Sequence, residues 1–455
     1  MNKWPVVPKL GNKEPSSGMW IVRVISLFSI ISAFALGWVS LACAEVLTLP
    51  QGLRLARESS RLIKINQEQE KISEGDTLIA KSALLPSINA SANQTFYAKQ
   101  PFAVFGPFTV PTMEKNFPSY SLSIQQLLYD FGVTISRYRS SKAILETKKI
   151  DTVRIRNFVS LDFALVYFDL LESEKLMLVG ESEVRTLEAH LRDAKNMYEN
   201  GVITKNDLLQ AEVRLSDARQ KVLNARNLRA VNASRLNTVL SRPLNTDVQV
   251  MDVEFTPSGY TVFDRGKAFE SAVQERPEVR IIVETMNALD LEEKSRKAEY
   301  YPRFFASASY DYTDNRYLSP EANASLILGM SMNLFSGGST KAELLKTEYR
   351  RRQLLEQKAR IEDEVRLEVE KNLLDLSNAR ERMKVAKDAV GQAEENLRIN
   401  RVRYEEGVGT ATEVLDAVTL LTTAETNHYR ALYDFRRAEA SVFYSMGKDL
   451  VEIYQ

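Results

Sequence analysis

The segment Tyr-Glu-Asn-Gly-Val at Tyr198–Val202 returns later in the chain as Tyr-Glu-Glu-Gly-Val at Tyr404–Val408. A second matched pair has the same offset of 206 residues: Leu-Tyr-Asp-Phe-Gly at Leu128–Gly132 and Leu-Phe-Ser-Gly-Gly at Leu334–Gly338. Self-similarity at a fixed offset indicates a duplicated structural unit. The second half of the chain therefore repeats the first.

Between its matched segments, each half contains almost nothing that ends a helix. Residues 133–200 have no proline and one glycine, Gly180, and residues 339–406 have no proline and one glycine, Gly391. We expect one helix in each stretch, roughly 100 Å long at about 1.5 Å per residue. An ordinary globular helix has about 11–12 residues, so helices of this length are not what a compact enzyme domain requires.

A return helix is predicted after each Tyr-x-x-Gly turn, over about Thr204–Leu240 and Thr410–Tyr444. The two return segments share an apolar series at the same offset, with charges of both signs between its members. The paired positions are Leu208, Leu209, Ala211 and Leu215 with Val414, Leu415, Ala417 and Leu421. An apolar stripe with charged flanks predicts antiparallel coiled-coil packing against the long helices.

Each half also begins with a helix-type segment that a proline ends. The first runs from about Leu49 to Leu84, before Pro86, and the second from about Val262 to Ala298, before Pro302. The offset here is 216, so the first half carries ten more residues between its proline and its glycine. The proline-rich stretch from Pro101 to Pro118 is the natural place for this longer loop.

After each of these prolines the apolar period changes from helical to two. Two segments of about ten residues in each half alternate apolar with small or polar side chains. The apolar positions are Ile88, Ala90 and Ala92; Tyr120, Leu122 and Ile124; Phe304, Ala306, Ala308, Tyr310 and Tyr312; and Ala324, Leu326, Leu328, Met330 and Met332. This pattern fits transmembrane β-strands and, equally, a soluble hairpin with one buried face.

The N-terminus resembles a secretory signal. Four basic residues precede an apolar run from Val24 to Val39, and Ala42-Cys43-Ala44 supplies small residues at both outer positions. That order predicts cleavage before Glu45, with either Met1 or Met19 as the true start. Two alternatives are a retained membrane anchor, for which about 16 residues is short, and lipidation of Cys43. A signal peptide and the long helices favour the membrane interpretation of the strands.

Charge and cysteine content limit the function further. Lys+Arg and Asp+Glu balance at 60 each, which gives no reason to expect nucleic acid or another polyanion as a partner. Removal of residues 1–44 takes away four positive charges and one negative charge and leaves a net charge of −3. It also removes Cys43, the only cysteine. The mature chain would then form no disulfide and carry no thiol chemistry.

The sequence contains no recognisable catalytic or metal-binding constellation. His190 and His428, the only histidines, lie in helical patterns without a partner at ligand spacing, so we expect them to be satisfied or solvent-facing. No Walker loop, dinucleotide fingerprint or nucleophile elbow is present. Gly337-Gly338 is better explained as a strand-to-helix turn than as a phosphate loop. The prediction is a protein that is not an enzyme and holds no cofactor or metal.

The order of signal, helix, proline, two strands, glycine, long helix, Tyr-x-x-Gly turn and return helix, all duplicated, resembles the TolC family of outer-membrane efflux proteins. The resemblance covers essentially Glu45 to Leu450. Its most specific parts are Tyr404-Glu-Glu-Gly-Val-Gly-Thr-Ala-Thr-Glu-Val-Leu-Asp-Ala417, which is similar to the family's second periplasmic turn, and the strand exit Asn333-Leu-Phe-Ser-Gly-Gly338. Residues 1–44 are then the signal peptide, 45–245 the first repeat and 246–455 the second.

This resemblance implies an α+β membrane protein that works as a homotrimer. Four strands from each of three copies would form a 12-stranded barrel in the outer-membrane lipid, and the helices would form an α-barrel across the periplasm. One physical argument agrees, since four strands cannot close a barrel alone and open edges cannot face lipid. The implied function is a passive exit duct for a periplasmic adaptor and an inner-membrane pump of the RND or ABC type, in efflux or type I secretion.

The resemblance also assigns site residues. The family's gate acids fall on Glu413 and Asp416 and its gate tyrosine on Tyr404, while Gly409 replaces an arginine of the best-known member. The implied adaptor-contacting tips are Gly201 and Val202 in the first half and Gly407, Val408, Gly409 and Thr410 in the second.

Ordinary turn and helix chemistry offers a second explanation for these residues. Glycine lets a chain reverse between helices, and Thr410-x-x-Glu413 fits a capping box that Thr204-x-x-Asp207 repeats. Capping does not need Asp416, whose counterpart is Gln210. In a trimer, six gate carboxylates would raise one another's pKa and attract cations.

Two other function classes remain open at this level. A non-conducting coiled-coil scaffold of the cell envelope with a small β-tip would share the helices but would neither conduct ions nor need to form trimers. An envelope hydrolase is disfavoured by the absence of any catalytic motif.

Overall fold

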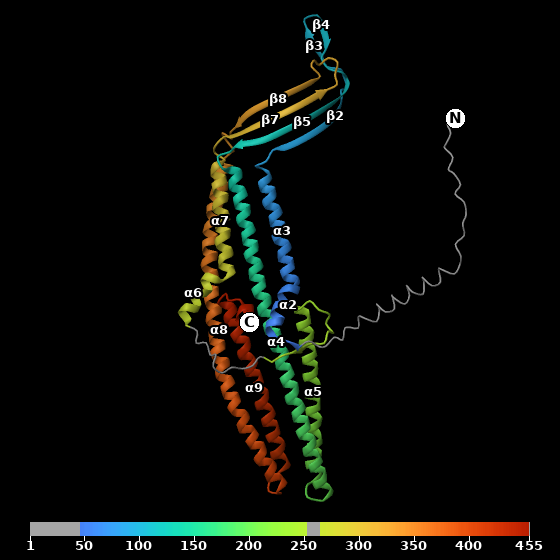
Figure 1. The fold of residues 1–455 in the computed structure, drawn as a ribbon, viewed down its shortest axis with the longest axis vertical. Helices are drawn as coiled ribbons and strands as arrows, with labels where there is room; N and C mark the ends of the chain where they lie inside the picture. Colours follow the sequence, from blue (N-terminus) through green and yellow to red (C-terminus); the bar gives the residue numbers. More distant parts are fainter. Residues whose placement is uncertain (1–45, 253–263, 455) are drawn as a thin grey trace, which may run out of the picture. The chain divides into compact units, whose positions relative to one another are not determined.

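The computed structural model describes residues 46–252 and 264–454, and the predicted signal peptide lies outside them. From Leu47 onward the described residues belong to one compact unit. In chain order the elements are β1 (Val46–Leu47), α2 (Leu49–Ser59), α3 (Arg61–Ser82), β2 (Ser87–Phe96), β3 (Phe102–Phe105), β4 (Phe108–Pro111), β5 (Asn116–Tyr129), α4 (Val133–Glu199), α5 (Lys205–Val239), β6 (Gln249–Val250), α6 (Arg265–Glu275), α7 (Pro277–Ala298), β7 (Arg303–Thr313), β8 (Ala322–Ser331), α8 (Ser339–Glu405), α9 (Ala411–Ser445) and α10 (Leu450–Ile453) (Figure 1).

The two predicted long helices and their return helices are confirmed. Helices α4 and α8 each have 67 residues, and α5 and α9 each have 35. Gly132 and Gly338 precede the long helices with φ of 98° and 84°, a left-handed conformation that costs glycine nothing. Gly180 and Gly391 lie inside the helices without breaking them, as the missing prolines led us to expect.

The two predicted helical segments that begin each half are each divided in two, which corrects the prediction of single helices. Ser60 adopts an extended ψ of 124° between α2 and α3, and its hydroxyl accepts the N–H of Ile63 as an N-cap. Arg276 is extended in the same way between α6 and α7, because Pro277 disfavours a helical conformation in the residue before it. Residues 262 and 263 of the second segment lie outside the described residues.

The main sheet has four antiparallel strands in the order β2-β5-β7-β8. Its register brings the alternating apolar residues of all four strands onto one face, as in the row Ala90, Leu122, Tyr310 and Ala324. The neighbouring row, Ser91, Ser121, Asp311 and Asn323, belongs to the other face. Leu326 and Leu328 are 72% and 74% exposed. No other part of residues 46–252 and 264–454 therefore covers the apolar face in one copy.

The predicted long loop between Pro101 and Pro118 is not irregular throughout. It contains the hairpin of β3 and β4, in which Phe102 pairs with Pro111 and Phe105 with Phe108, and Pro118 already belongs to β5. The Phe-Ala-Val-Phe and Phe-Thr-Val-Pro segments are too short for their alternation to distinguish a strand from an extended loop. The prolines therefore led to the prediction of a loop.

The helices repeat the lateral order of the sheet. Next to the sheet, α3 packs on α4, α4 on α7, and α7 on α8. Toward the opposite end the order is α5, α4, α9 and α8. Helices α3, α5 and α8 are therefore edge elements, as strands β2 and β8 are.

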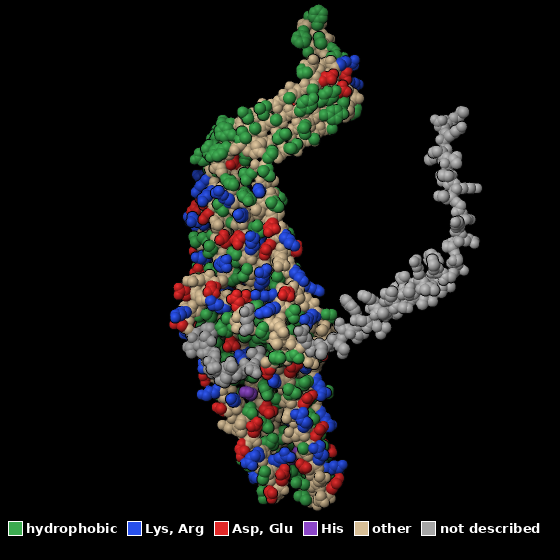
Figure 2. Space-filling model, in the orientation of Figure 1, with side chains coloured by type: hydrophobic (Ala, Val, Ile, Leu, Met, Phe, Trp, Pro, Cys, Tyr) green, Lys and Arg blue, Asp and Glu red, His purple; other side chains and the backbone are tan. Residues whose placement is uncertain are grey.

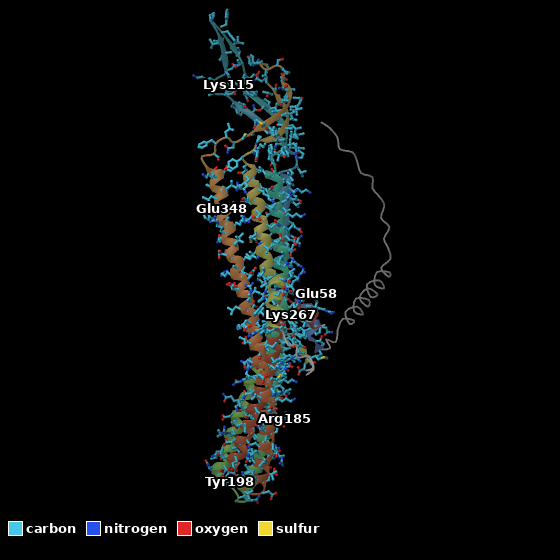
Figure 3. All side chains as sticks on the ribbon, turned by 90° about the vertical axis from the view of Figure 1, so that its left-hand side faces the viewer. Glu58, Lys115, Arg185, Tyr198, Lys267 and Glu348 are labelled. Carbon is cyan, nitrogen blue, oxygen red and sulfur yellow. The ribbon has the colours of Figure 1, made fainter. Side chains whose placement is uncertain are left out.

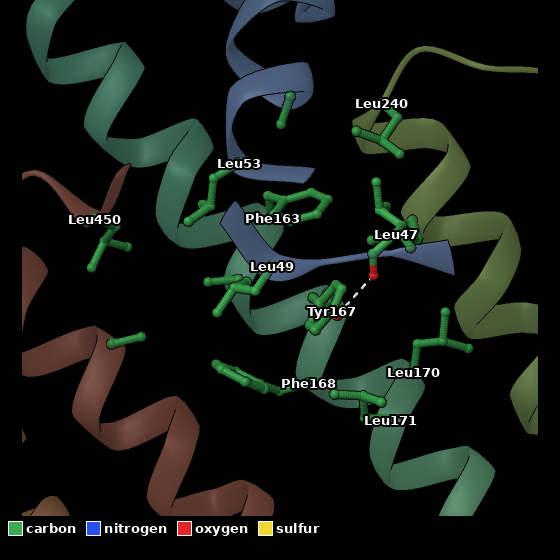
Figure 4. Close-up of a cluster of buried hydrophobic side chains, with 14 of the residues drawn as sticks. Leu47, Leu49, Leu53, Phe163, Tyr167, Phe168, Leu170, Leu171, Leu240 and Leu450 are labelled. Atoms are coloured by element: carbon green, nitrogen blue, oxygen red, sulfur yellow. Dashed lines mark hydrogen bonds between the residues drawn. The ribbon is translucent and has the colours of Figure 1, made fainter. Parts of the chain in front are cut away.

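The largest hydrophobic core lies where the repeats join, around the middle of α4 (Figure 4). Phe163, Tyr167 and Phe168 of α4 are fully buried there against Leu53 of α2 and Leu450 of α10. The Tyr167 hydroxyl donates to the backbone carbonyls of Leu47 (3.0 Å) and Met251 (2.5 Å). The close approach of Phe163 requires glycine at position 52, since a Cβ there would lie 2.1 Å from its ring.

Side-chain chemistry divides the surface into two zones (Figure 2). Hydrophobic side chains gather over the sheet and the β3–β4 hairpin, whereas Lys, Arg, Asp and Glu dominate the helices. Among the described residues, no helix combines the length and the apolar character that a membrane span needs.

Candidate functional site at the two helical tips

The α4–α5 and α8–α9 turns form the two tips at the end opposite the sheet, where Figure 3 labels Tyr198. Gly201 and Gly407 both have a φ of 73°. The N–H of Val202 donates to Met197 (2.8 Å), and the N–H of Val408 donates to Arg403 (2.9 Å). Both valines project outward, with 66% and 70% of their surface exposed. The two halves thus build the same turn and present one exposed valine each.

The capping boxes expected at both tips are present. The Thr204 hydroxyl accepts the N–H of Asp207, and the Asp207 carboxylate accepts the N–H of Thr204 at 3.0 Å. Thr410 and Glu413 make the same reciprocal pair, with 2.9 Å from the Thr410 N–H to Glu413. Glu413 therefore caps α9 and is not a free carboxylate.

Gly409 has a steric role that the sequence did not reveal. It lacks a positive φ, but a Cβ at this position would lie 3.0 Å from the backbone nitrogen of Tyr404 and 3.1 Å from the carbonyl carbon of Arg403. The corresponding residue of the first tip is Ile203. The second turn is therefore wound more tightly onto the end of its long helix.

Asp416 lies outside the capping box, and its side chain is 66% exposed on α9. One of its oxygens is 3.8 Å from the guanidinium of Arg214 on α5. Gln210, the counterpart of Asp416, lies in the same region, since its amide oxygen accepts the hydroxyl of Thr412 at 3.5 Å. Asp416 is thus placed where the two hairpins meet.

Glu413 also has a basic neighbour. Its second oxygen lies 3.7 Å from the guanidinium of Arg403 on α8. Arg403 and Arg214 are basic neighbours of the gate acids that the sequence analysis did not name. Arg403 could have been noticed next to Tyr404, whereas Arg214 approaches Asp416 only through tertiary packing.

Tyr404 is 5% exposed and packs against Ala411, Val414, Met197 and Leu397. Its hydroxyl has no hydrogen-bond partner among the described residues. Burial, followed by the charges of Asp207 and Asp193, raises the pKa of this phenol. The ring of Tyr404 therefore packs as an apolar side chain between α4 and the α8–α9 tip. It forms no ion pair with the described residues.

His190 of α4 lies beside Tyr404, with ring centroids 5.3 Å apart. It is 6% exposed, and its Nε2 has no partner in the described part of the chain. The expectation of a satisfied or solvent-facing histidine is therefore wrong for this residue. Burial lowers the pKa of His190, and Arg401 lowers it further, while Asp193 acts in the opposite direction. Burial therefore disfavours the charged form of the imidazole in the contact between the two hairpins.

The tips carry no arrangement that suits catalysis or metal binding. Across residues 46–252 and 264–454, no group of three His, Cys, Asp or Glu side chains is placed to hold a metal ion. What the site offers is a pair of exposed turns, a buried aromatic contact and two carboxylates near arginines. Such an arrangement suits docking and opening of the helical end better than chemistry on a substrate.

Comparison with known proteins identifies relatives of this chain. A family model described as outer membrane efflux protein matches residues 53–242 and 269–448. The alkaline protease secretion protein AprF of Pseudomonas aeruginosa is 23% identical over 451 residues, which cover 94% of this chain and 88% of AprF. The outer membrane efflux protein BepC of Brucella suis is 20% identical over 409 residues, which cover 88% of this chain and 85% of BepC.

Solved structures agree on the fold. The outer-membrane channel OprN superposes with a TM-score of 0.75 at 17% identity, covering 88% of this chain and 89% of OprN. VceC of Vibrio cholerae gives a TM-score of 0.74 at 16% identity, covering 88% of this chain and 96% of VceC. The predicted fold class is confirmed, and the chain is an outer-membrane channel protein, extending into the periplasm, rather than an enzyme. It belongs to the family of outer membrane efflux proteins.

Proposed function

We propose that three copies of this chain form a passive exit duct through the outer membrane and the periplasm. The observation that carries the proposal is the four-stranded sheet, which has one apolar face, one polar face and two unpaired edges, β2 and β8. Backbone groups of an open edge cannot remain unpaired in hydrocarbon. Pairing of the β8 edge of one copy with the β2 edge of the next gives the backbone groups of both edges hydrogen-bond partners.

The number of strands favours three copies over two. Two copies would give eight strands, and side chains alone fill a barrel of that size. Three copies give twelve strands and leave an aqueous interior. The polar face fits such an interior, since Asp311 accepts hydrogen bonds from Ser121 and Ser309 at 2.5 and 2.7 Å, and Ser309 contacts Ser325 at 2.9 Å.

The edge helices support the same assembly. Ile65, Ile72 and Ile79 of α3 follow one another at intervals of seven residues and are 58–70% exposed. On the opposite edge, Leu367 and Leu374 of α8 are 69% and 54% exposed. Apolar stripes at heptad spacing are typical of helices that pack on other helices, and the neighbouring copies supply those partners.

The helical tips then face the inner membrane, and the exposed turns would meet a periplasmic adaptor that links the duct to an inner-membrane pump. AprF is by name a secretion protein and BepC an efflux protein, so both export of protein and efflux of small compounds fit the family. Asp416, with Glu413, would line the periplasmic end of the duct. The repeats proposed for residues 45–245 and 246–455 supply one hairpin each to this end.

The test is the oligomeric state and conductance of the protein extracted from outer membranes. We expect trimers in detergent and ion channels in planar bilayers. Leu328→Arg on the apolar face should cost about 2–4 kcal/mol at mid-depth and impair assembly, while Ser331→Arg on the polar face should assemble. A soluble monomer would overturn the proposal, and trimers without conductance would support a scaffold instead.

A further inference from the structure

The β3–β4 hairpin is an apolar surface that nothing in the described part of one copy covers. No charged residue occurs between Gln100 and Met113. The hairpin register places Phe102 and Val104 on one face and Phe105 and Phe108 on the other. The exposed fractions are 55% for Phe102, 70% for Val104, 66% for Phe105, 72% for Phe108 and 49% for Val110. An isolated two-stranded hairpin is marginally stable in water, and a contiguous exposed apolar patch indicates a contact surface.

The base of the hairpin is firmly attached to the sheet. Asn315, in the β7–β8 loop, is fully buried, and its side-chain oxygen accepts the N–H groups of Glu114 (3.2 Å) and Tyr317 (3.1 Å). Arg316 pairs with Glu114 at 2.5 Å. The neighbouring Lys115 is labelled at this end in Figure 3. The hairpin is therefore held by a specific network and is not a loose loop.

The attachment covers the polar face of the sheet only at the end next to the hairpin, at Phe117. Phe117 continues the row of Ser119 and Ser121 on that face, yet it is 6% exposed and contacts the ring of Tyr97 at 6.0 Å. On the apolar face at the same end, Tyr120 and Tyr310 remain 52% and 53% exposed. The hairpin thus begins from the side of the sheet that faces the interior of the proposed barrel.

We propose that the three β3–β4 hairpins of a trimer pack against one another over the outer mouth of the barrel, as an apolar cap. This inference rests on the trimer proposed above. Twelve strands spaced roughly 4.8 Å apart and tilted by about 40° give a barrel radius of about 12 Å. Strand β3, at about 3.3 Å per residue, rises about 10 Å from Phe102 to Phe105, and the turn at Gly106 extends the hairpin to about 13 Å. Each hairpin is long enough to meet its copies at the axis.

Two further observations select other copies of the chain as the occupant. Tyr120, Tyr310 and Tyr312 cluster on the apolar face, where aromatic side chains mark the membrane interface. The hairpin lies beyond this level, so the hydrocarbon of the lipid does not reach it. Its surface is also uncharged, so three identical hairpins can meet at a threefold axis without electrostatic repulsion.

Cysteine cross-linking tests the contact directly. Cys43 is the only cysteine of the sequence and precedes the predicted cleavage site. We expect Phe105→Cys to form a disulfide between two copies in oxidised outer membranes, and reduction to raise the channel conductance. Tyr310→Cys, at the same end but on the apolar face, is the matched control and should not cross-link. Intact trimers of Phe105→Cys without a disulfide would overturn the cap, whereas absence of trimers would overturn the proposed function.

Fluorescence distinguishes the cap from burial in lipid. All three tryptophans, Trp4, Trp20 and Trp38, precede Glu45, so Phe105→Trp gives a single reporter after cleavage. In vesicles of brominated phosphatidylcholine, the cap predicts an emission at short wavelength that the bromines do not quench. Strong quenching would place the hairpin in the hydrocarbon and overturn the proposal. Emission typical of water-exposed tryptophan would also overturn the proposal.

Discussion

The two helical tips have the same backbone design but different surroundings. Each has a 67-residue helix, a glycine with a φ of 73°, a capping box and a 35-residue return helix. Yet Tyr404 is 5% exposed, and its counterpart Tyr198 is 39% exposed. Likewise Leu415 is buried, and its counterpart Leu209 is 47% exposed. Helix α9 lies between α4 and α8, whereas α5 is an edge helix. The two repeats therefore share the design of the turn but differ in the side chains and helices that pack around it.

Because the two tips are packed differently, we expect them to have different roles at the site. The first tip has the more exposed return helix. In the proposed trimer, a neighbouring copy packs against this helix. The second tip is fastened to the first hairpin by the contact of Tyr404 with His190 and the approach of Arg214 to Asp416. Opening of the helical end would have to disturb these contacts first. The following variants test whether the two tips differ as their surroundings indicate.

The largest expected effect is the loss of export when the exposed tip valines are enlarged. Val408→Trp should abolish export while trimers remain, because an exposed valine has no internal contacts to lose and a bulky ring obstructs docking. Val202→Trp should act in the same direction, since both valines are similarly exposed. The measurement is restoration of export in cells that lack the chain, together with the yield of trimers. Normal export by Val408→Trp would contradict the docking role.

Truncation of the two tyrosines should separate the tips by stability. Tyr404→Ala should cost about 3–5 kcal/mol, the usual range for a buried aromatic side chain, and Tyr198→Ala less than about 1 kcal/mol. Tyr404→Phe should be nearly neutral, because the hydroxyl that it removes has no partner among the described residues. Hydrogen exchange of the tip amides measures each effect. Equal losses at both tips would refute the difference in packing.

Replacement of the gate carboxylate should change selectivity more than stability. Asp416→Ala removes a pair with Arg214 that is largely exposed, and such pairs contribute about 0–1 kcal/mol. We expect weaker cation selectivity and weaker block by multivalent cations in planar bilayers, with trimers unchanged. Arg214→Ala should strengthen cation selectivity, and Gln210→Ala in the first repeat should leave it unchanged. Wild-type selectivity and block in Asp416→Ala would leave Asp416 without a gate role.

The smallest expected effect is a pH dependence of the contact between the hairpins. Burial lowers the pKa of His190 in the folded protein, so its contribution to stability is present above the pKa of the unfolded chain and is lost as the pH falls through the folded pKa. Asp193, Arg401, Tyr404 and Asp207 are the charged and titratable groups around this contact. Protection of the tip amides should therefore weaken toward mildly acidic pH. His190→Phe should flatten that dependence, whereas Asn396→Phe, at the matching position of the second repeat, should not.

Local sequence was sufficient for much of the fold. The glycines at positions 132, 201, 338 and 407, the absence of proline between them and the capping threonines define where each long helix begins, turns and returns, because these are local backbone effects. Alternation of apolar and polar residues likewise predicted the two faces of the sheet. The break at Arg276 also has a local cause in Pro277, although the helical pattern predicts a continuous helix there.

Tertiary structure alone decided what each repeated residue does. Two turns of the same backbone design contain a buried Tyr404 and an exposed Tyr198, because burial depends on which helix of the other repeat lies alongside. Arg214 reaches Asp416, and His190 meets Tyr404, across more than 200 residues of sequence. The attachment of the β3–β4 hairpin through Asn315 has the same origin. The sequence specifies short-range conformation through backbone sterics and capping, while the partners of buried and charged side chains are set only when distant segments pack together.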